Sequence, residues 1–211
     1  MKNIVVKNKP VWTTQRDNYD RDGHPEFSNQ CMIESFTYFW RWLWKTFFIT
    51  ETFLDDRAYY AIVLNSLKSG ETRYDWEVHL RITNDYLMKK NIPARLTLHK
   101  TNESWKDVLQ SIVKGNPVVM SIDIRSALNS KTRKGHIVFL AGLSVDDLGE
   151  VRGIYILDPY GSINTNYRDQ NGDMIFIQME KAIKLIDESS HCAILEIDKI
   201  DSNTSGGAQV G

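Results

Sequence analysis

A long apolar segment that begins at Cys31 constrains the fold of this chain more than any other feature of its sequence. From Cys31 to Phe48, apolar side chains recur at spacings of three and four, and further aromatic residues make the segment apolar over most of a helical circumference. Its most hydrophobic part, residues 36–49, is interrupted by Arg41 and Lys45 and is shorter than the roughly 20 residues of a membrane-spanning helix. We therefore predict a helix in the middle of a protein core and no membrane span.

The composition is that of a folded protein rather than collagen, a coiled coil or a disordered chain. Of the 211 residues, 42% are hydrophobic and 25% are charged, with 12 glycines and 5 prolines. We expect one domain over residues 1–200. Residues 201–211 are rich in Ser, Gly, Asn and Thr, which predicts a flexible tail or linker.

Charge and cysteine content narrow the class of protein further. Lys and Arg number 26 against 27 Asp and Glu, so no net charge attracts nucleic acid or an anionic membrane, and we expect no nucleic-acid partner and a monomer. Two cysteines, Cys31 and Cys192, are too few for a disulfide scaffold and are interpreted as thiols. The first ten residues lack the apolar stretch of a secretory signal, which predicts synthesis in the cytoplasm.

The secondary-structure pattern changes along the chain and indicates an α+β fold. Turn-rich residues 13–30 end in Ser28, Asn29 and Gln30, residue types that cap helices, so a helix should start near Cys31. Segregated helices and strands favour α+β over a repeating βαβ fold. The expected helices cover residues 57–67, 74–90, 104–114 and 179–186, and the expected strands cover residues 118–124, 136–143, 153–157, 174–178 and 192–197.

Cys31 is the candidate nucleophile because the capping pattern places it in the first turn of the central helix. Free backbone N–H groups and the helix dipole stabilise a thiolate there, and the thiolate is the form that attacks a carbonyl. The alternative is a buried structural cysteine, the commoner state of a single Cys.

A catalytic cysteine needs a general base and a group that orients it. Among five histidines, His136 follows a polar segment and opens an apolar strand, which places its ring at a rim with a rigid strand behind it. Asp158 ends the next strand and begins an Asp-Pro-Tyr-Gly turn, so pairing of the two strands would bring it to His136. The alternatives are a histidine that merely ends a strand and an aspartate that only forms a turn.

Together these residues resemble the C39-like branch of the papain-like cysteine peptidases. That family has Gln-x-Asp-Asn, a loop, a Cys that opens a helix, Gly-His with an apolar strand, and Asp-Pro-x-Gly. The resemblance covers roughly residues 11–200. Its pieces here are Gln15-Arg16-Asp17-Asn18, Cys31, Gly135-His136-Ile137-Val138 and Asp158-Pro159-Tyr160-Gly161, with Gly115-Asn116-Pro117-Val118-Val119 matching the strand before the histidine.

The resemblance implies a papain-like fold, in which a helical N-terminal half carries the nucleophile and packs on an antiparallel sheet from the C-terminal half. It also implies that Cys31 is the nucleophile, His136 the general base and acid, and Asp158 the orienting group. Gln15 would donate to the oxyanion, and no cofactor would be required for the chemistry. One departure is Glu34, one turn after Cys31, whose carboxylate would disfavour a thiolate if it faced the sulfur; we expect it to point away.

A second motif in the same region suggests calcium. The pattern Asn-x-Asp-x-Asp-Gly from Asn18 follows an EF-hand loop, although its last position is Asn instead of a bidentate Glu. The alternative is a solvated acidic turn. A structural Ca²⁺ would have its candidate ligands at Asn18, Asp20, Asp22, His24, Glu26 and Asn29.

The sequence thus predicts a cysteine endopeptidase that acts through an acyl-enzyme. By analogy of layout with stand-alone family members, the expected substrate is a peptide of peptidoglycan, cut by an endolysin-like enzyme that reaches the cell wall after release. The alternative from another class is a catalytically silent peptide-binding or assembly module with the same fold. An acyl transferase would use the same dyad and differ only in the acceptor of the acyl group.

Overall fold

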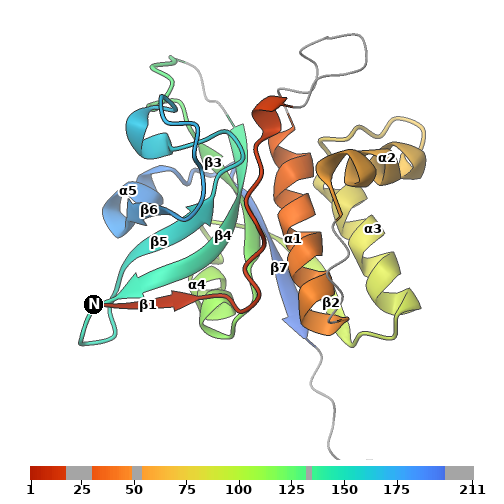
Figure 1. Ribbon diagram of the computed structural model, residues 1–211, viewed down its shortest axis with the longest axis horizontal. Coiled ribbons are helices and arrows are strands. Elements are labelled where there is room, and N and C mark those ends of the chain that lie inside the picture. The colour runs from red at the N-terminus through yellow and green to blue at the C-terminus, as the bar shows by residue number, and fades with distance from the viewer. Residues whose placement is uncertain (18–29, 49–53, 132–134, 198–211) are drawn as a thin grey trace, which may run out of the picture.

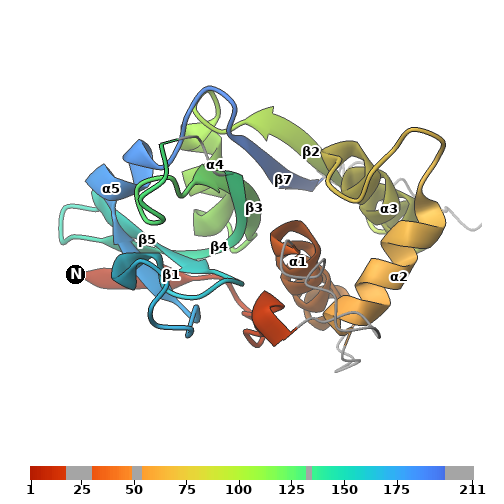
Figure 2. The same ribbon diagram turned by 90° about the horizontal axis from the view of Figure 1, so that it is seen from above.

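The computed structural model describes residues 1–17, 30–48, 54–131 and 135–197, and in these ranges it forms one curved antiparallel sheet with helices on both sides (Figures 1 and 2). The helices are α1 (Cys31–Phe47), α2 (Asp56–Ser66), α3 (Trp76–Lys89), α4 (Trp105–Val113) and α5 (Met179–Lys184), with short 3-10 turns η1 (Gln15–Asp17) and η3 (Ile163–Thr165). The strands are β1 (Lys2–Val5), β2 (Ala94–Lys100), β3 (Val118–Asp123), β4 (Gly135–Val145), β5 (Val151–Leu157), β6 (Ile175–Gln178) and β7 (His191–Ile197).

The sheet has the strand order β2-β7-β3-β4-β5-β6, and β1 also pairs with β4. Every one of these pairings is antiparallel. Helix α1 packs against β4 and β3, and α2 and α3 lie beyond α1, whereas α4 lies on the other side of the sheet (Figure 2). Within the described ranges, no helix is long and apolar enough to cross a bilayer.

The predicted α+β arrangement is confirmed, with one correction to the separation of helices and strands. The expected helices and strands are present, with ends shifted by a few residues. However, β1 and β2 come from the N-terminal half and join the sheet, β2 through a full ladder with β7. The side chains of β1 are mostly exposed, so no apolar alternation marks it in the sequence. The expected tail over residues 201–211 lies outside the described residues.

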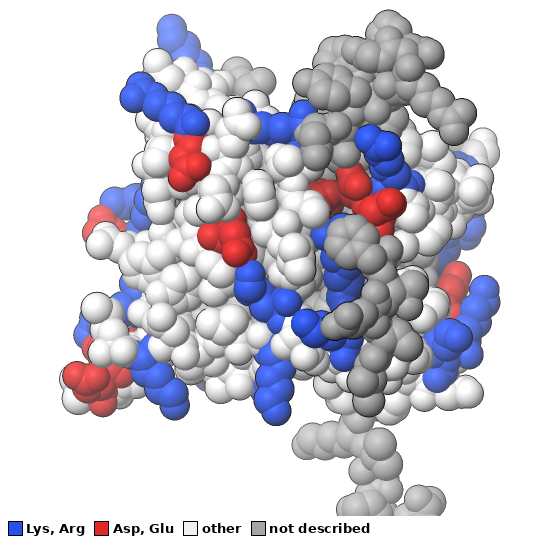
Figure 3. All heavy atoms as spheres, in the orientation of Figure 1, with Lys and Arg blue, Asp and Glu red and all other residues white. Residues whose placement is uncertain are grey.

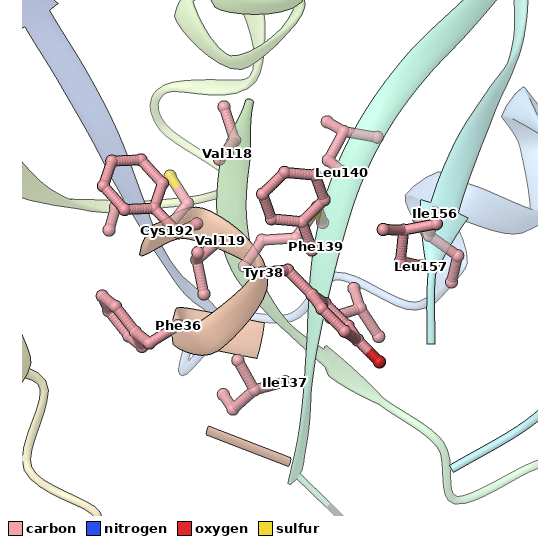
Figure 4. Close-up of a cluster of buried hydrophobic side chains, with 14 of the residues drawn as sticks. Phe36, Tyr38, Val118, Val119, Ile137, Phe139, Leu140, Ile156, Leu157 and Cys192 are labelled. Carbon is pink, nitrogen blue, oxygen red and sulfur yellow. The ribbon is translucent and has the colours of Figure 1, made fainter. Parts of the chain in front are cut away.

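The centre of the core is the contact between α1 and the sheet. Phe36, Tyr38 and Phe39 are fully buried, and Figure 4 shows Tyr38 beside Phe139 of β4, whereas Phe36 points to the side of α1 away from β4. The rings of Tyr38 and Phe139 meet edge to face, with 6.0 Å between centroids. Each such side chain stabilises the fold by roughly 1.5–3 kcal/mol through burial, so α1 is held firmly on β4.

The start of α1 differs in detail from the sequence prediction. The residue before the helix is Gln30, and its side chain makes no capping hydrogen bond; Ser28 and Asn29 lie outside the described residues. The helix instead is tied to the sheet by the hydroxyl of Ser35, which donates to the carbonyl oxygen of Ile137 at 3.0 Å. This bond sets the position of the first turn of α1 relative to the start of β4.

A buried histidine links α3 to α1 and α2. The ring of His79 stacks on Phe36 at 4.5 Å, its Nδ1 bonds the hydroxyl of Tyr59 at 2.8 Å, and its Nε2 bonds the carbonyl oxygen of Arg73 at 2.9 Å. Burial lowers the pKa of His79 from 6.5 to about 4. The folded protein therefore holds this imidazole neutral where the unfolded chain protonates it.

We predict that His79→Gln reduces the sensitivity of stability to acid. Below pH 6.5 the unfolded chain binds a proton at His79, whereas the folded protein binds it only near pH 4. The free energy of unfolding therefore falls as the pH falls from 6.5 to about 4. The loss amounts to about 3 kcal/mol, and the variant should not show it. Urea unfolding of both proteins at pH 7 and pH 4 measures the difference, and equal pH dependence would contradict the prediction. His136 does not contribute here, because its raised pKa leaves it protonated in both states below pH 6.5.

Candidate active site

Cys31 is the first residue of α1 and carries a free, half-buried thiol. Its position at the helix N-terminus exposes the sulfur to unpaired backbone N–H groups, which favour negative charge. Cys192, in contrast, lies fully buried in β7, where burial raises its pKa to about 11. Of the two thiols, only Cys31 combines access to solvent with a position at the N-terminus of a helix.

His136 and Asp158 meet because β4 and β5 are paired. His136 is the second residue of β4, Asp158 directly follows β5, and the antiparallel register brings these two strand ends together. The Nε2 atom of His136 lies 2.7 Å from Oδ1 of Asp158. Both side chains are almost entirely shielded from solvent, so the carboxylate fixes the orientation of the imidazole.

The electrostatics of His136 connect it to the thiol as well. Burial by itself lowers the pKa of His136, but the charge and hydrogen bond of Asp158, together with those of Cys31, raise it to about 10. Because Nε2 is held by Asp158, Nδ1 is the ring nitrogen left to face the sulfur of Cys31. The arrangement therefore stabilises an imidazolium at neutral pH between the carboxylate of Asp158 and the sulfur of Cys31.

Several groups hold the carboxylate of Asp158 in place. The backbone N–H of Tyr160 donates to Oδ1 at 2.9 Å, and the hydroxyl of Tyr167 donates to Oδ2 at 3.2 Å. Burial and the nearby charge of Asp158 raise the pKa of Tyr167, so its hydroxyl stays protonated and remains a donor. The rings of Tyr160 and Tyr167 also meet the ring of His136 edge-on, with centroids at 6.3 and 6.0 Å.

A glycine allows the chain to pass close behind Asp158. The backbone N–H of Asp158 donates to the carbonyl oxygen of Gly172 at 2.9 Å. A Cβ atom at position 172 would lie 1.8 Å from the carbonyl oxygen of Asp158 and 2.8 Å from Nε1 of Trp12. Gly172 is thus required by contact with backbone, since no side chain fits at this position.

Gln15 lies beside the same loop. It is the first residue of η1, is 3% exposed, and its backbone N–H donates to the carbonyl oxygen of Pro159 at 2.9 Å. Glu34, whose carboxylate we expected to point away from Cys31, is fully buried and accepts a short hydrogen bond from the hydroxyl of Thr13. The structure therefore brings Cys31, His136 and Asp158 together and places the segment that carries Gln15 against them.

Comparison with known proteins identifies the family to which this geometry belongs. The sequence matches the Peptidase_C39 like family over residues 34–185, a range that contains His136 and Asp158 and begins just after Cys31. The chain belongs to the Peptidase_C39 like family. A search of curated proteins gave no match.

Solved structures support the fold of this C39-like chain. One similar structure is described as "Crystal structure of UfSP from C.elegans", with a TM-score of 0.56 and 15% sequence identity. The match covers 93% of this chain and 34% of that one, so this chain spans about a third of the length of its structural relative. The family match confirms the predicted resemblance to C39-like proteins, and the structural match supports the predicted fold.

The residues of the predicted calcium motif are not among those that the structure describes. Its candidate ligands Asn18, Asp20, Asp22, His24, Glu26 and Asn29 all lie outside the described residues. Among the residues that the structure does describe, no group of three or more His, Cys, Asp and Glu side chains is placed to hold a metal ion.

Two cavities of the described chain lie away from Cys31 and His136. One, of about 410 Å³, is lined by residues of α4 and β7, and the other, of about 280 Å³, by residues of α1, α2 and α3. Neither cavity is lined by a cysteine, so the candidate active site is defined by Cys31, His136 and Asp158 and not by the volume of a cavity.

Sequence reasoning missed the groups that support the C39-like site. Tyr167 has a left-handed backbone conformation with φ of 61° and carries the hydroxyl that holds Asp158, and Trp12 donates from Nε1 to the carbonyl oxygen of Asp158 at 2.8 Å. Neither residue belongs to a motif, and an isolated Tyr or Trp is typical of any core. Only the folded arrangement shows their role.

We predict selective alkylation of Cys31. At neutral pH, iodoacetamide should modify Cys31 and leave Cys192 unmodified in the folded protein, because Cys192 is buried and its pKa is about 11. His136→Ala should abolish the rapid labelling of Cys31. Peptide mass spectrometry measures both sites, and equal, slow labelling of the two thiols would contradict the prediction.

We predict that Asp158→Asn lowers the pKa of His136. The charge of Asp158 is the largest of the influences that oppose burial, ahead of Cys31, so its loss shifts the imidazole toward its neutral form. The rate of Cys31 alkylation at pH 7 should then fall about tenfold or more, since each unit of pKa corresponds to a factor of ten. Ring-proton NMR of His136 and alkylation rates provide the measurement.

The matched control is Asp173→Asn, which removes an exposed carboxylate from the same part of the chain, where it pairs with Lys9. It should change neither quantity. A His136 pKa that stays near 10 in Asp158→Asn would show that another group sets the charge of the ring.

Proposed function

We propose that this C39-like protein is an endopeptidase that cleaves amide bonds of peptidoglycan peptides through Cys31, His136 and Asp158, with Gln15 as an oxyanion donor. The observation that carries the proposal is the buried imidazole of His136, bonded to Asp158 at 2.7 Å, with a pKa raised by both Asp158 and Cys31. Such a pair makes a nucleophilic thiolate and a general acid available at the same pH.

The acylation step follows from these positions. The Cys31 thiolate adds to the carbonyl carbon of the scissile amide, and the carbonyl oxygen takes up the negative charge. The backbone N–H of Cys31 and the side chain of Gln15 stabilise that oxyanion. The imidazolium of His136 gives its proton to the leaving nitrogen, the carbon–nitrogen bond breaks, and an acyl-thioester remains on Cys31.

Deacylation reverses the proton movement. His136, now neutral, takes a proton from water as the oxygen attacks the thioester carbon. The second tetrahedral intermediate collapses, and the carbon–sulfur bond breaks. The product carboxylic acid dissociates, and the thiolate–imidazolium pair is restored. Asp158 holds the ring throughout and stabilises its charged form.

Two observations support a peptide of mixed charge as the substrate. Family membership implies a peptide substrate. On the face drawn in Figure 3, basic and acidic side chains are interspersed among uncharged ones. The peptides of peptidoglycan carry both free amino and free carboxyl groups, and we therefore propose them as the substrate, reached in the cell wall.

The test is incubation of the protein with bacterial cell walls of several cross-link types, followed by mass spectrometry of the released fragments. We expect fragments with new amine ends from at least one wall type, and none with Cys31→Ala. Release that persists in Cys31→Ala would refute the thiol mechanism. Thiol-dependent cleavage of casein but of no wall would refute the substrate alone, and absence of cleavage from both would favour a silent binding module.

A further inference from the structure

The segment Val11–Arg16, here called the strap, connects the helix that carries Cys31 to the loop that carries Asp158. It runs beside α1 and ends at η1, next to the N-terminal end of that helix (Figures 1 and 2). Alternate residues of the strap contact different partners: one side bonds α1, and the other side bonds the loop that carries Asp158. The strap is therefore placed to set the position of Gln15.

The centre of the strap, Thr13, is held by three side chains of α1. The hydroxyl of Thr13 donates to Oε1 of Glu34 and accepts from Nη1 of Arg41 at 2.9 Å. The hydroxyl of Tyr38 donates to the carbonyl oxygen of Thr13 and accepts from its N–H at 3.4 Å. Both the backbone and the side chain of Thr13 are thereby fixed to one helix.

These three residues continue a stripe that begins at the nucleophile. Cys31, Glu34, Tyr38 and Arg41 are separated by three, four and three positions, so they share one face of α1. Arg41 also donates to the carbonyl oxygen of Val11 at 3.2 Å. The strap therefore runs antiparallel to α1, from the level of Arg41 toward that of Cys31.

The lengths agree with this direction. Ten residues of helix span about 15 Å, and the four steps from Val11 to Gln15 span about 13 Å when extended. These lengths place Gln15 near the level of Cys31, two residues after Thr13, where its backbone N–H also donates to the carbonyl oxygen of Pro159.

Side chains on the other side of the strap donate hydrogen bonds to backbone carbonyl oxygens of the loop that carries Asp158. Trp12 donates to the carbonyl oxygen of Asp158, Thr14 donates from Oγ1 to that of Pro159 at 3.3 Å, and Arg16 donates to that of Tyr160 at 2.6 Å. The carboxylate of Asp158 has separate donors in Tyr160 and Tyr167. Displacement of the strap would therefore affect Gln15 more than the bond between Asp158 and His136.

The free-energy cost of burying Glu34 and Arg41 indicates that the cluster has a role beyond packing α1. Glu34 is fully buried and Arg41 is 8% exposed, and removal of two such charges from water costs several kcal/mol each before their attraction is counted. Apolar side chains would pack α1 with less penalty. The hydroxyl of Thr13, which bridges the two, gives the strap one defined register along the helix.

We propose that Glu34, Thr13 and Arg41 form a positioning cluster that sets the side chain of Gln15 as oxyanion donor beside Cys31. The inference rests on the proposed function, because it assigns the cluster a role in acylation. It also gives Glu34, the departure from the family pattern, a task in the same site. None of the three is a catalytic residue, since each acts through Gln15.

The test compares Thr13→Val with Thr37→Val. Valine matches threonine in shape, and each change removes one hydroxyl; among the described residues, that of Thr37 bonds only the carbonyl oxygen of Ile33 within α1, at 2.8 Å. Two rates are measured at pH 7: the acylation burst with p-nitrophenyl acetate, which passes through an oxyanion, and alkylation by iodoacetamide, which does not. A third variant, Gln15→Ala, and its double variant with Thr13→Val complete the set.

We expect Thr13→Val to slow acylation at least about tenfold, with the 100 to 1000-fold loss typical of removing an oxyanion donor as the upper limit, and to leave alkylation within twofold of wild type. Thr37→Val should leave both rates within twofold. In the Gln15→Ala background, Thr13→Val should have no further effect, because the donor that it positions is gone.

The outcomes separate the two proposals. Wild-type protein without a thiol-dependent burst would refute the proposed function and the cluster's role with it. A normal burst in wild type, with Thr13→Val no slower than Thr37→Val, would overturn the positioning role alone. Equal losses of acylation and alkylation in Thr13→Val, or full additivity with Gln15→Ala, would likewise overturn it, because the cluster would then act on the fold or on Cys31 directly.

Discussion

The hydrogen bond between His136 and Asp158 is formed where water has almost no access, and the rest of the site depends on this condition. A charged imidazole in such surroundings is unfavourable unless opposite charge lies next to it. Asp158 and Cys31 supply that charge, and the amide of Tyr160 and the hydroxyl of Tyr167 hold the carboxylate in place. The same burial that would discharge an isolated histidine therefore strengthens its interaction with its partners.

Helix α1 performs two tasks through two of its faces. Its apolar face, with Phe36 and Phe39, anchors the helix in the core. Its polar stripe, which includes Glu34 and Arg41, holds the strap. A displacement of α1 would move both the sulfur of Cys31 and the segment that carries Gln15. The geometry of the C39-like site therefore depends on the packing of the core.

The sequence predicted those parts of the fold and site that local pattern controls. The apolar periodicity after Cys31 located α1, and the short β-branched runs located β3 to β7, because side-chain spacing matches helix or strand geometry over a few residues. It did not predict β1, whose side chains are mostly exposed, or the role of β2 as the partner of β7. Of the expected capping residues Ser28, Asn29 and Gln30, only Gln30 lies among the described residues, and its side chain makes no capping hydrogen bond.

By itself, the sequence determined which residue types stand at the start of a helix and at the ends of two strands, and that order was enough to predict the family. It could not place Tyr167 near Asp158 or Thr13 between Glu34 and Arg41, because these residues are separated by up to 28 positions and share no motif. Only the register between β4 and β5, and the path of the chain along α1, decided which side chains meet. The physical reason is that spacing along the chain fixes local geometry, whereas contact between distant segments depends on how the whole core packs.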